Sequence, residues 1–209
     1  MILVGQYDSP FVRRVAISLR VLGFDYRHDT RSVFGDFDAM RQVNPLGRIP
    51  SLTLDSGETI IDSAAILDWL DQQVGPQQAL VPVSGAARQA ALQRIALATG
   101  IVDKCGAAAY ERIIRPPQYR WPDWIERCRL QAAGALAALA RMPWPDDAPL
   151  DQAHITTGCA LRYVRLSDPD LLPAGRHPAL DALSARLEAL QEFRATYPAD
   201  YVVPKGDTP

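Results

Sequence analysis

The sequence predicts an α/β domain with the element order β-α-β-α-β-β-α, followed by an all-helical domain. Over the first 75 residues the hydrophobic period changes repeatedly, between short apolar runs and the three-to-four-residue spacing of amphipathic helices. Beyond residue 86 only the helical spacing recurs. A right-handed β-α-β crossover, followed by a hairpin and a covering helix, makes one mixed sheet with helices on its faces. We therefore expect an N-terminal domain over 1–75, a linker over 76–86 and a helical domain over 87–209.

Local patterns predict the elements of the first domain. The apolar run at 2–4 is typical of a buried strand. Pro10 opens a helical pattern that Gly23 can end. The turn signal at 55–57 lies between two short strands and predicts a hairpin. The expected elements are a strand at 2–4, a helix that begins at Pro10, a strand at 26–29, a helix at 34–43, hairpin strands at 51–54 and 59–61, and a helix at 62–73.

The second half is predicted to be helical after an uncharged segment. Residues 74–85 contain two prolines, two glycines and no charge, which fits an inter-domain linker. Helices are expected at 88–115, 122–141 and 152–166, with a last long helix around 180–190. Asp151 is a suitable N-cap for the third of these, which is apolar almost all round. That helix is therefore expected at the centre of the bundle.

Composition excludes several classes of protein. Apolar residues make up 48% and charged residues 22% of the 209 residues, which argues against a disordered chain. A net charge of −2 gives no electrostatic footprint for nucleic acid, and no apolar run approaches the roughly 18–20 residues that a membrane span needs. The three cysteines, Cys105, Cys128 and Cys159, have neither metal-ligand spacing nor an obvious disulfide framework. We expect a cytoplasmic protein with no metal and with no nucleic-acid or membrane partner.

The first candidate site residue is Ser9, at the junction between the first strand and the first helix. Pro10 suits the first helical position, so Ser9 is a good N-cap whatever the protein does. The same position places a hydroxyl among free N–H groups and at the positive end of the helix dipole. A thiolate brought to that point would be stabilised by the hydroxyl and by the local field.

Two later segments also allow a structural or a functional interpretation. A cis bond between Ile49 and Pro50 would turn the N–H and C=O of Ile49 toward a peptide-like ligand, whereas a trans bond would be a simple turn. Asp62 and Ser63 stand at the start of a helix, where they suit an N-cap. They also suit an amino-acid head group, with its carboxylate on Ser63 and free N–H groups and its ammonium on Asp62.

Together the three segments resemble the cytosolic glutathione S-transferase family. The motifs are Ser-Pro-Phe-Val-x-Arg after the first strand, Asn-Pro-x-Gly-Arg-Ile-Pro before the third, and Asp-Ser-x-x-Ile-Leu after the fourth. Each is weak alone, but the ordered set within 1–75 is fairly specific, and the helical remainder fits the family's second domain. The sequence looks closest to serine-type and related bacterial members with Ser-Pro-Phe. The resemblance implies a thioredoxin-like first domain, a homodimer and a role in detoxification.

The resemblance also implies roles for individual residues. Ser9 matches the residue whose hydroxyl faces the glutathione sulfur and lowers the pKa of its thiol. Ile49, before a presumed cis-Pro50, matches the residue whose backbone pairs with the cysteinyl unit. Asp62 and Ser63 match the pair that holds the γ-glutamyl end.

Two further positions are implied, and two questions stay open. Phe11 would line the thiol pocket, and Arg48, where the family often has lysine, would assist at a carboxylate of glutathione. Asp62 stands where the family usually has glutamate, and its shorter side chain can weaken the contact with the ammonium. Tyr7 is an alternative to Ser9 as the activating hydroxyl, because strand alternation would point both residues the same way.

The implied activity is that of a glutathione transferase, in which the thiol of the co-substrate glutathione attacks a small electrophile. A glutathione-dependent isomerase or dehalogenase would use the same residues and differ only in the helical domain. Proteins of the stringent-starvation type and some elongation-factor subunits resemble this fold but serve as non-catalytic protein-binding modules, and fold alone does not exclude them. The sequence does not identify the second substrate.

Overall fold

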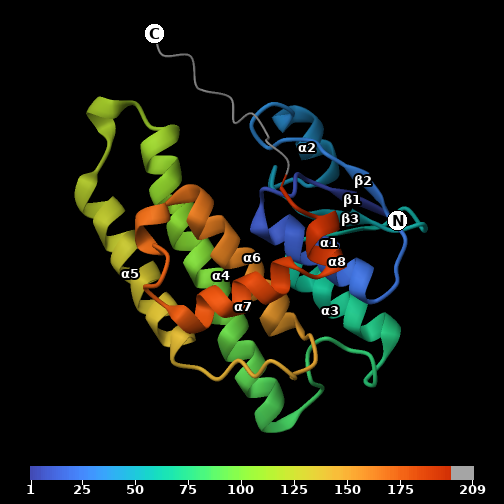
Figure 1. The fold of residues 1–209 in the computed structure, drawn as a ribbon. Helices are drawn as coiled ribbons and strands as arrows, with labels where there is room; N and C mark the ends of the chain where they lie inside the picture. The colour runs from blue at the N-terminus through green and yellow to red at the C-terminus, as the bar shows by residue number, and fades with distance from the viewer. Residues whose placement is uncertain (199–209) are drawn as a thin grey trace. The chain divides into compact units, whose positions relative to one another are not determined.

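The computed structural model describes residues 1–198, which form two compact units (Figure 1). The first unit is Met1–Arg88 together with the described residues from Leu190 onward, and the second is Gln89–Ala189. This division differs from the predicted helical domain over 87–209, because residues 190–198 belong to the α/β unit. Residues 199–209 of that predicted domain lie outside the described residues.

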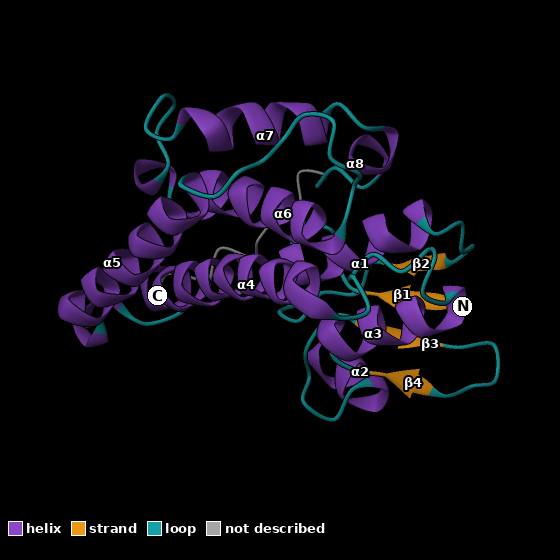
Figure 2. Cartoon of the chain, turned by 90° about the horizontal axis from the view of Figure 1, so that it is seen from below, coloured by secondary structure: helices purple, strands orange, loops and turns teal. Residues whose placement is uncertain are grey.

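The first unit is built on a mixed sheet, four-stranded in the described chain, which confirms the predicted fold class (Figure 2). Its strands are β1 (Ile2–Val4), β2 (Arg27–Asp29), β3 (Ser51–Thr53) and β4 (Thr59–Ile60), in the spatial order β2-β1-β3-β4. β1 pairs in parallel with β2 and antiparallel with β3, and β3 pairs antiparallel with β4. The predicted crossover and hairpin are therefore both present.

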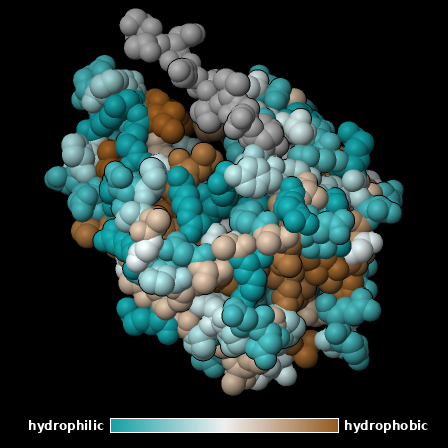
Figure 3. All heavy atoms as spheres, viewed as in Figure 1, coloured by the Kyte–Doolittle hydropathy of each residue, from teal (hydrophilic) through white to brown (hydrophobic). Residues whose placement is uncertain are grey.

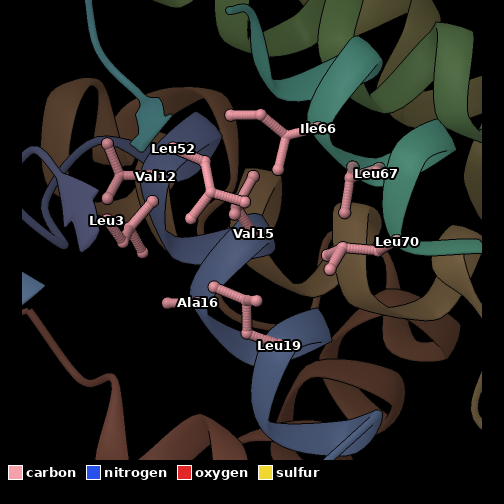
Figure 4. Packing of buried hydrophobic residues seen from close by; sticks show 9 residues of the cluster. All are labelled: Leu3, Val12, Val15, Ala16, Leu19, Leu52, Ile66, Leu67 and Leu70. Atoms are coloured by element: carbon pink, nitrogen blue, oxygen red, sulfur yellow. The ribbon is translucent and has the colours of Figure 1, made fainter. Parts of the chain in front are cut away.

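Three helices of the first unit follow the predicted order. They are α1 (Pro10–Val21), α2 (Phe37–Val43) and α3 (Ser63–Val74). α1 and α3 contribute apolar faces to one buried cluster with β1 and β3, as Figure 4 shows. Its members are Leu3, Val12, Val15, Ala16, Leu19, Leu52, Ile66, Leu67 and Leu70. Because burial of each Val, Leu or Ile side chain contributes about 1.5–3 kcal/mol, this cluster fixes α1 and α3 on the sheet.

The C-terminal part of the first unit is held by a buried arginine. The short helix α8 (Gln191–Ala195) follows Leu190. Arg13, only 1% exposed, donates from Nε to the carbonyl of Thr196 at 3.1 Å and from Nη2 to that of Phe193 at 3.0 Å. Its guanidinium also lies 5.4 Å from the centre of the Phe193 ring, a cation–π contact. A residue from the first helix thus explains why this late segment belongs with the α/β unit.

The second unit is helical, as predicted. Its elements, with the N-terminal turn of α4 preceding the unit, are α4 (Gly85–Ile113), η1 (Pro117–Tyr119), α5 (Pro122–Ala140), α6 (Gln152–Ser167), η2 (Pro169–Leu171) and α7 (Pro178–Glu188). Side chains from Gln152 to Leu161 are all buried, which confirms the expected central position of α6. None of the helices in residues 1–198 is long and apolar enough to cross a membrane.

Asp151 and His154 contact each other at the start of α6. Asp151 caps the helix by accepting from the backbone N–H of His154 at 2.8 Å, and its carboxylate also contacts the ring Nδ1 at 2.7 Å. Burial opposes ionisation of Asp151, but the contacts with His154 outweigh it and lower the carboxyl pKa.

All three cysteines are buried, and burial raises the pKa of the Cys105 thiol to about 12. These thiols therefore resemble core residues more than nucleophiles.

Apolar side chains also reach the surface of the second unit. Tyr110, Ile113 and Ile114, near the C-terminal end of α4, are each at least half exposed. Figure 3 shows brown, hydrophobic surface in the upper left, where this end of α4 lies in Figure 1. A second brown area lies to the lower right of the centre, and elsewhere that face mixes hydrophobic residues with hydrophilic ones.

Candidate functional site

Sheet topology brings the three candidate segments to one end of the first unit. Val4 at the end of β1 pairs with Ser51 at the start of β3, and Ile60 at the end of β4 pairs with Leu52. The chain leaving β1, the chain entering β3 and the chain leaving β4 therefore all lie at the same edge. These are the segments that carry the predicted site residues.

Gly5 marks how closely two of these segments approach each other. A Cβ at this position would lie 2.6 Å from Cγ2 of Val12 and 2.8 Å from Cβ of Ile49. With φ at +128°, Gly5 also adopts a backbone conformation that other residues rarely accept. The missing side chain lets the segment after β1 meet the segment before β3.

Ser9 is the N-cap of α1 and is partly exposed. Its Oγ accepts from the N–H of Val12 at 3.4 Å, which is long for a hydrogen bond. In the described chain the N–H of Phe11 has no acceptor. Ser9 and Phe11 thus present an O–H and an N–H at the positive end of the helix dipole, a setting that favours an anion.

Asp8 adds a carboxyl next to this helix start. Burial raises the pKa of Asp8, while contacts with backbone N–H groups of Ser9 and of Asp8 itself act in the opposite direction. Desolvation is the larger effect, so the folded environment disfavours a negative charge on this side chain.

Tyr7 lies in a turn and not in a strand. β1 ends at Val4, so the alternation expected to align Tyr7 with Ser9 does not apply. The Tyr7 hydroxyl is 2.9 Å from that of Tyr26, and its ring stacks on His28 with centroids 3.9 Å apart. These contacts engage the Tyr7 side chain with residues at and beside β2.

The segment before β3 forms a compact turn that leaves one peptide unit unpaired. Asn44, 2% exposed, donates from Nδ2 to the carbonyl of Arg48 at 2.7 Å and accepts from the N–H of Leu46 at 2.9 Å. The Ile49–Pro50 peptide bond is cis. Within residues 1–198, neither the N–H nor the C=O of Ile49 has a hydrogen-bond partner. The side chain of Arg48 is exposed.

At the start of α3, Asp62 lies at the surface and Ser63 in the interior. Asp62 is the exposed N-cap and accepts from the N–H of Ala64 at 2.9 Å, and the Ile61–Asp62 bond is cis. Ser63 is 3% exposed. Its Oγ accepts from Nη2 of Arg14 at 2.7 Å and from Nε at 3.2 Å. The backbone N–H of Ser63 has no acceptor in the described chain.

Comparison with known proteins identifies the family. The N-terminal domain of glutathione S-transferases matches residues 3–78. The solved structure of a glutathione transferase family member from Pseudomonas fluorescens Pf-5, with bound glutathione, is 35% identical in sequence. The match covers 95% of this chain and 98% of that one, with a TM-score of 0.83. The chain belongs to the glutathione transferase family.

Other known proteins are similar to this glutathione transferase family member over most of its length. A glutathione S-transferase from Methylobacterium radiotolerans, in complex with glutathione sulfonate, is 29% identical, with a TM-score of 0.89 and coverage of 97% of this chain and 96% of that one. A probable maleylacetoacetate isomerase from Drosophila melanogaster is 29% identical over 192 residues, which is 89% of this chain and 76% of that protein. The chain is therefore similar to proteins named for more than one reaction.

Sequence analysis of this glutathione transferase family member missed one residue at the edge described above. Arg14 was noted in the first motif but was given no role. It is 4% exposed, contacts Ser63 and lies 5.5 Å over the ring of Phe11. The available signal was that Arg13 and Arg14 lie between the apolar positions Val12, Val15 and Ala16 of a helix, since arginine is rarely buried without a specific partner.

Proposed function

We propose that this protein binds glutathione at the edge formed by the three segments and activates its thiol for attack on a small electrophile. The observation that carries the proposal is the set of unpaired groups there, above all the N–H and C=O of Ile49. A peptide-like ligand can pair with that unit as an added strand. The relatives from Pseudomonas and Methylobacterium, solved with glutathione and glutathione sulfonate, support the choice of ligand.

Each part of glutathione has a proposed partner. The backbone of Ile49, beside Pro50, pairs with the cysteinyl unit. Ser63 and the free N–H at the start of α3 hold the γ-glutamyl carboxylate, and exposed Asp62 pairs with the ammonium. Exposed Arg48 contacts a carboxylate of the tripeptide.

Ser9 is the proposed activating residue, and Phe11 lines the thiol pocket. An O–H from Ser9 and the N–H of Phe11 donate to the sulfur and stabilise the thiolate over the thiol, which lowers the thiol pKa. Each unit of that shift corresponds to about 1.4 kcal/mol. The thiolate then donates its electron pair to an electrophilic carbon, a carbon–sulfur bond forms, and the displaced electrons leave with a leaving group or move into a conjugated acceptor.

Titration of glutathione into the wild type and Ser9→Ala tests the proposal. Calorimetry reports binding, and ultraviolet absorbance of the bound thiolate reports ionisation. We expect both proteins to bind and only the wild type to give the thiolate signal. Binding by neither protein at millimolar glutathione would contradict the proposal and favour a non-catalytic protein-binding module.

A second reaction is favoured by the similarity to the probable maleylacetoacetate isomerase. In a glutathione-dependent isomerase the same thiolate adds to a conjugated cis double bond, rotation follows, and elimination regenerates free glutathione. The amount of glutathione consumed over many turnovers distinguishes the transferase reaction from the isomerase reaction. A transferase consumes one glutathione per product, whereas an isomerase consumes none.

We also propose a homodimer, on the basis of family membership. Sedimentation equilibrium of the purified chain tests it, with a mass twice that of one chain as the expected result.

A further inference from the structure

Arg14 brings a buried guanidinium to the start of α3. Its side chain crosses from α1, and both Nε and Nη2 donate to the single Oγ of Ser63, at 3.2 and 2.7 Å. Both residues are almost fully buried, at 4% and 3% exposure. The contact therefore lies in the interior, where a polar group without a hydrogen-bond partner is most costly.

This contact determines how the Ser63 hydroxyl accepts and donates hydrogen bonds. A guanidinium has five N–H donors and no acceptor, so Ser63 can only accept from Arg14. A serine oxygen has two lone pairs and one proton. With the lone pairs directed at Arg14, the O–H must point elsewhere.

The Ser63 proton has no acceptor among residues 1–198. In the hydrogen bonds of the described residues Ser63 Oγ only accepts, from Arg14, and its backbone N–H has no acceptor. A polar hydrogen at this depth is costly when unpaired, so an acceptor from a ligand would be favourable. Two donors side by side at the N-terminus of a twelve-residue helix fit a carboxylate.

We propose that Arg14 is a positioning residue that holds the Ser63 hydroxyl as an obligatory donor and thereby selects a carboxylate at the start of α3. The inference rests on the proposed function, in which this carboxylate is that of the γ-glutamyl unit. Arg14 does not touch the ligand. Because Arg14 has no acceptor, the Ser63 O–H cannot donate toward the interior at this contact and is directed to the ligand.

Two ligands separate this role from a simple bracing of α1 against α3. Glutathione carries the γ-glutamyl carboxylate, whereas 4-aminobutanoyl-cysteinylglycine lacks only that group. Binding of each is measured by calorimetry for the wild type, Arg14→Met and Arg20→Met. Arg20 is exposed on the same helix, so Arg20→Met matches the lost charge and the introduced side chain.

We expect Arg14→Met to weaken glutathione binding by about 10- to 100-fold, the range for losing a hydrogen bond to a charged group. The same variant should bind the carboxylate-free analogue as the wild type does, and Arg20→Met should match the wild type with both ligands. An equal loss for both ligands would show that Arg14 only braces the helices and would overturn the inference.

Ser63→Ala provides a second variant that keeps the arginine, in case Arg14→Met does not fold. It should also lose affinity for glutathione but not for the analogue, and wild-type affinity of Ser63→Ala for glutathione would overturn the inference. Failure of the wild type to bind glutathione would instead contradict the proposed function. The two failures are therefore distinct.

Discussion

The starts of α1 and α3 carry the same dipeptide and differ in what it does. Asp8-Ser9 precedes α1, and Asp62-Ser63 opens α3. In α1 the serine is the N-cap and the aspartate lies outside the helix, whereas in α3 the aspartate is the cap and the serine is the first helical residue. Pro10 accounts for the shift of one residue, because proline suits the first helical position.

This shift changes the environment of both side chains. Ser9 stays partly exposed with a long contact to its own helix, while Ser63 turns inward and accepts from Arg14. Asp62 is exposed, whereas burial raises the pKa of Asp8. The comparison teaches that position relative to the first helical turn, more than residue type, determines which hydroxyl can meet a sulfur and which can meet a carboxylate.

The largest expected effect is that of removing the Ser9 hydroxyl. Ser9→Ala should raise the pKa of the bound thiol by about one to two units, because a hydrogen bond to a charged group is lost. Turnover at neutral pH should fall about 10- to 100-fold and recover as pH rises toward the new pKa. A pH–rate profile measures this, with Tyr7→Phe as the control. If Tyr7→Phe gave the shift instead, Tyr7 would be the activating residue.

The next effect concerns the charge of Asp62. Asp62→Asn keeps a good N-cap but removes the proposed partner of the ammonium, so glutathione affinity should fall about tenfold. Glutaryl-cysteinylglycine, which lacks only the ammonium, should bind both proteins equally by calorimetry. An equal loss with both ligands would argue against the assigned pairing.

The two caps should differ in their contribution to stability. Asp62→Ala removes a contact of 2.9 Å and should lower the free energy of unfolding by about 1 kcal/mol. Ser9→Ala removes a contact of 3.4 Å and should cost about 0.5 kcal/mol or less. Urea denaturation of the three proteins measures both, and a reversed order would mean that the contact lengths do not reflect cap strength.

The smallest effect is the pH dependence of Asp8. Because burial raises its pKa in the folded state, ionised Asp8 destabilises the fold at neutral pH. Asp8→Asn should therefore raise the free energy of unfolding at pH 7 by about 0.5 kcal/mol or less. The gain should shrink as pH falls through the folded pKa and vanish below the unfolded value of about 4. Denaturation at several pH values tests the sign, and destabilisation by Asp8→Asn at pH 7 would contradict it.

Sequence reasoning located the elements of the first unit but not every contact that they make. The order of strands and helices was confirmed, as were the cap by Asp151 and the central place of α6. The strand position of Tyr7 was wrong, because the chain turns after Val4. The roles assigned to Ser9, Ile49, Asp62 and Ser63 stay predictions, although topology brings their segments to one edge of the sheet.

The sequence by itself determined the hydrophobic periods, the helix starts at proline and the ordered motifs that resemble the family, because these depend on neighbours within a few residues. Only the tertiary structure decided that Arg13 holds the chain after Leu190 and that Arg14 donates to Ser63. Those contacts join residues 183, 180 and 49 positions apart, respectively. No local pattern specifies such partners, since they depend on how separate elements pack into one core.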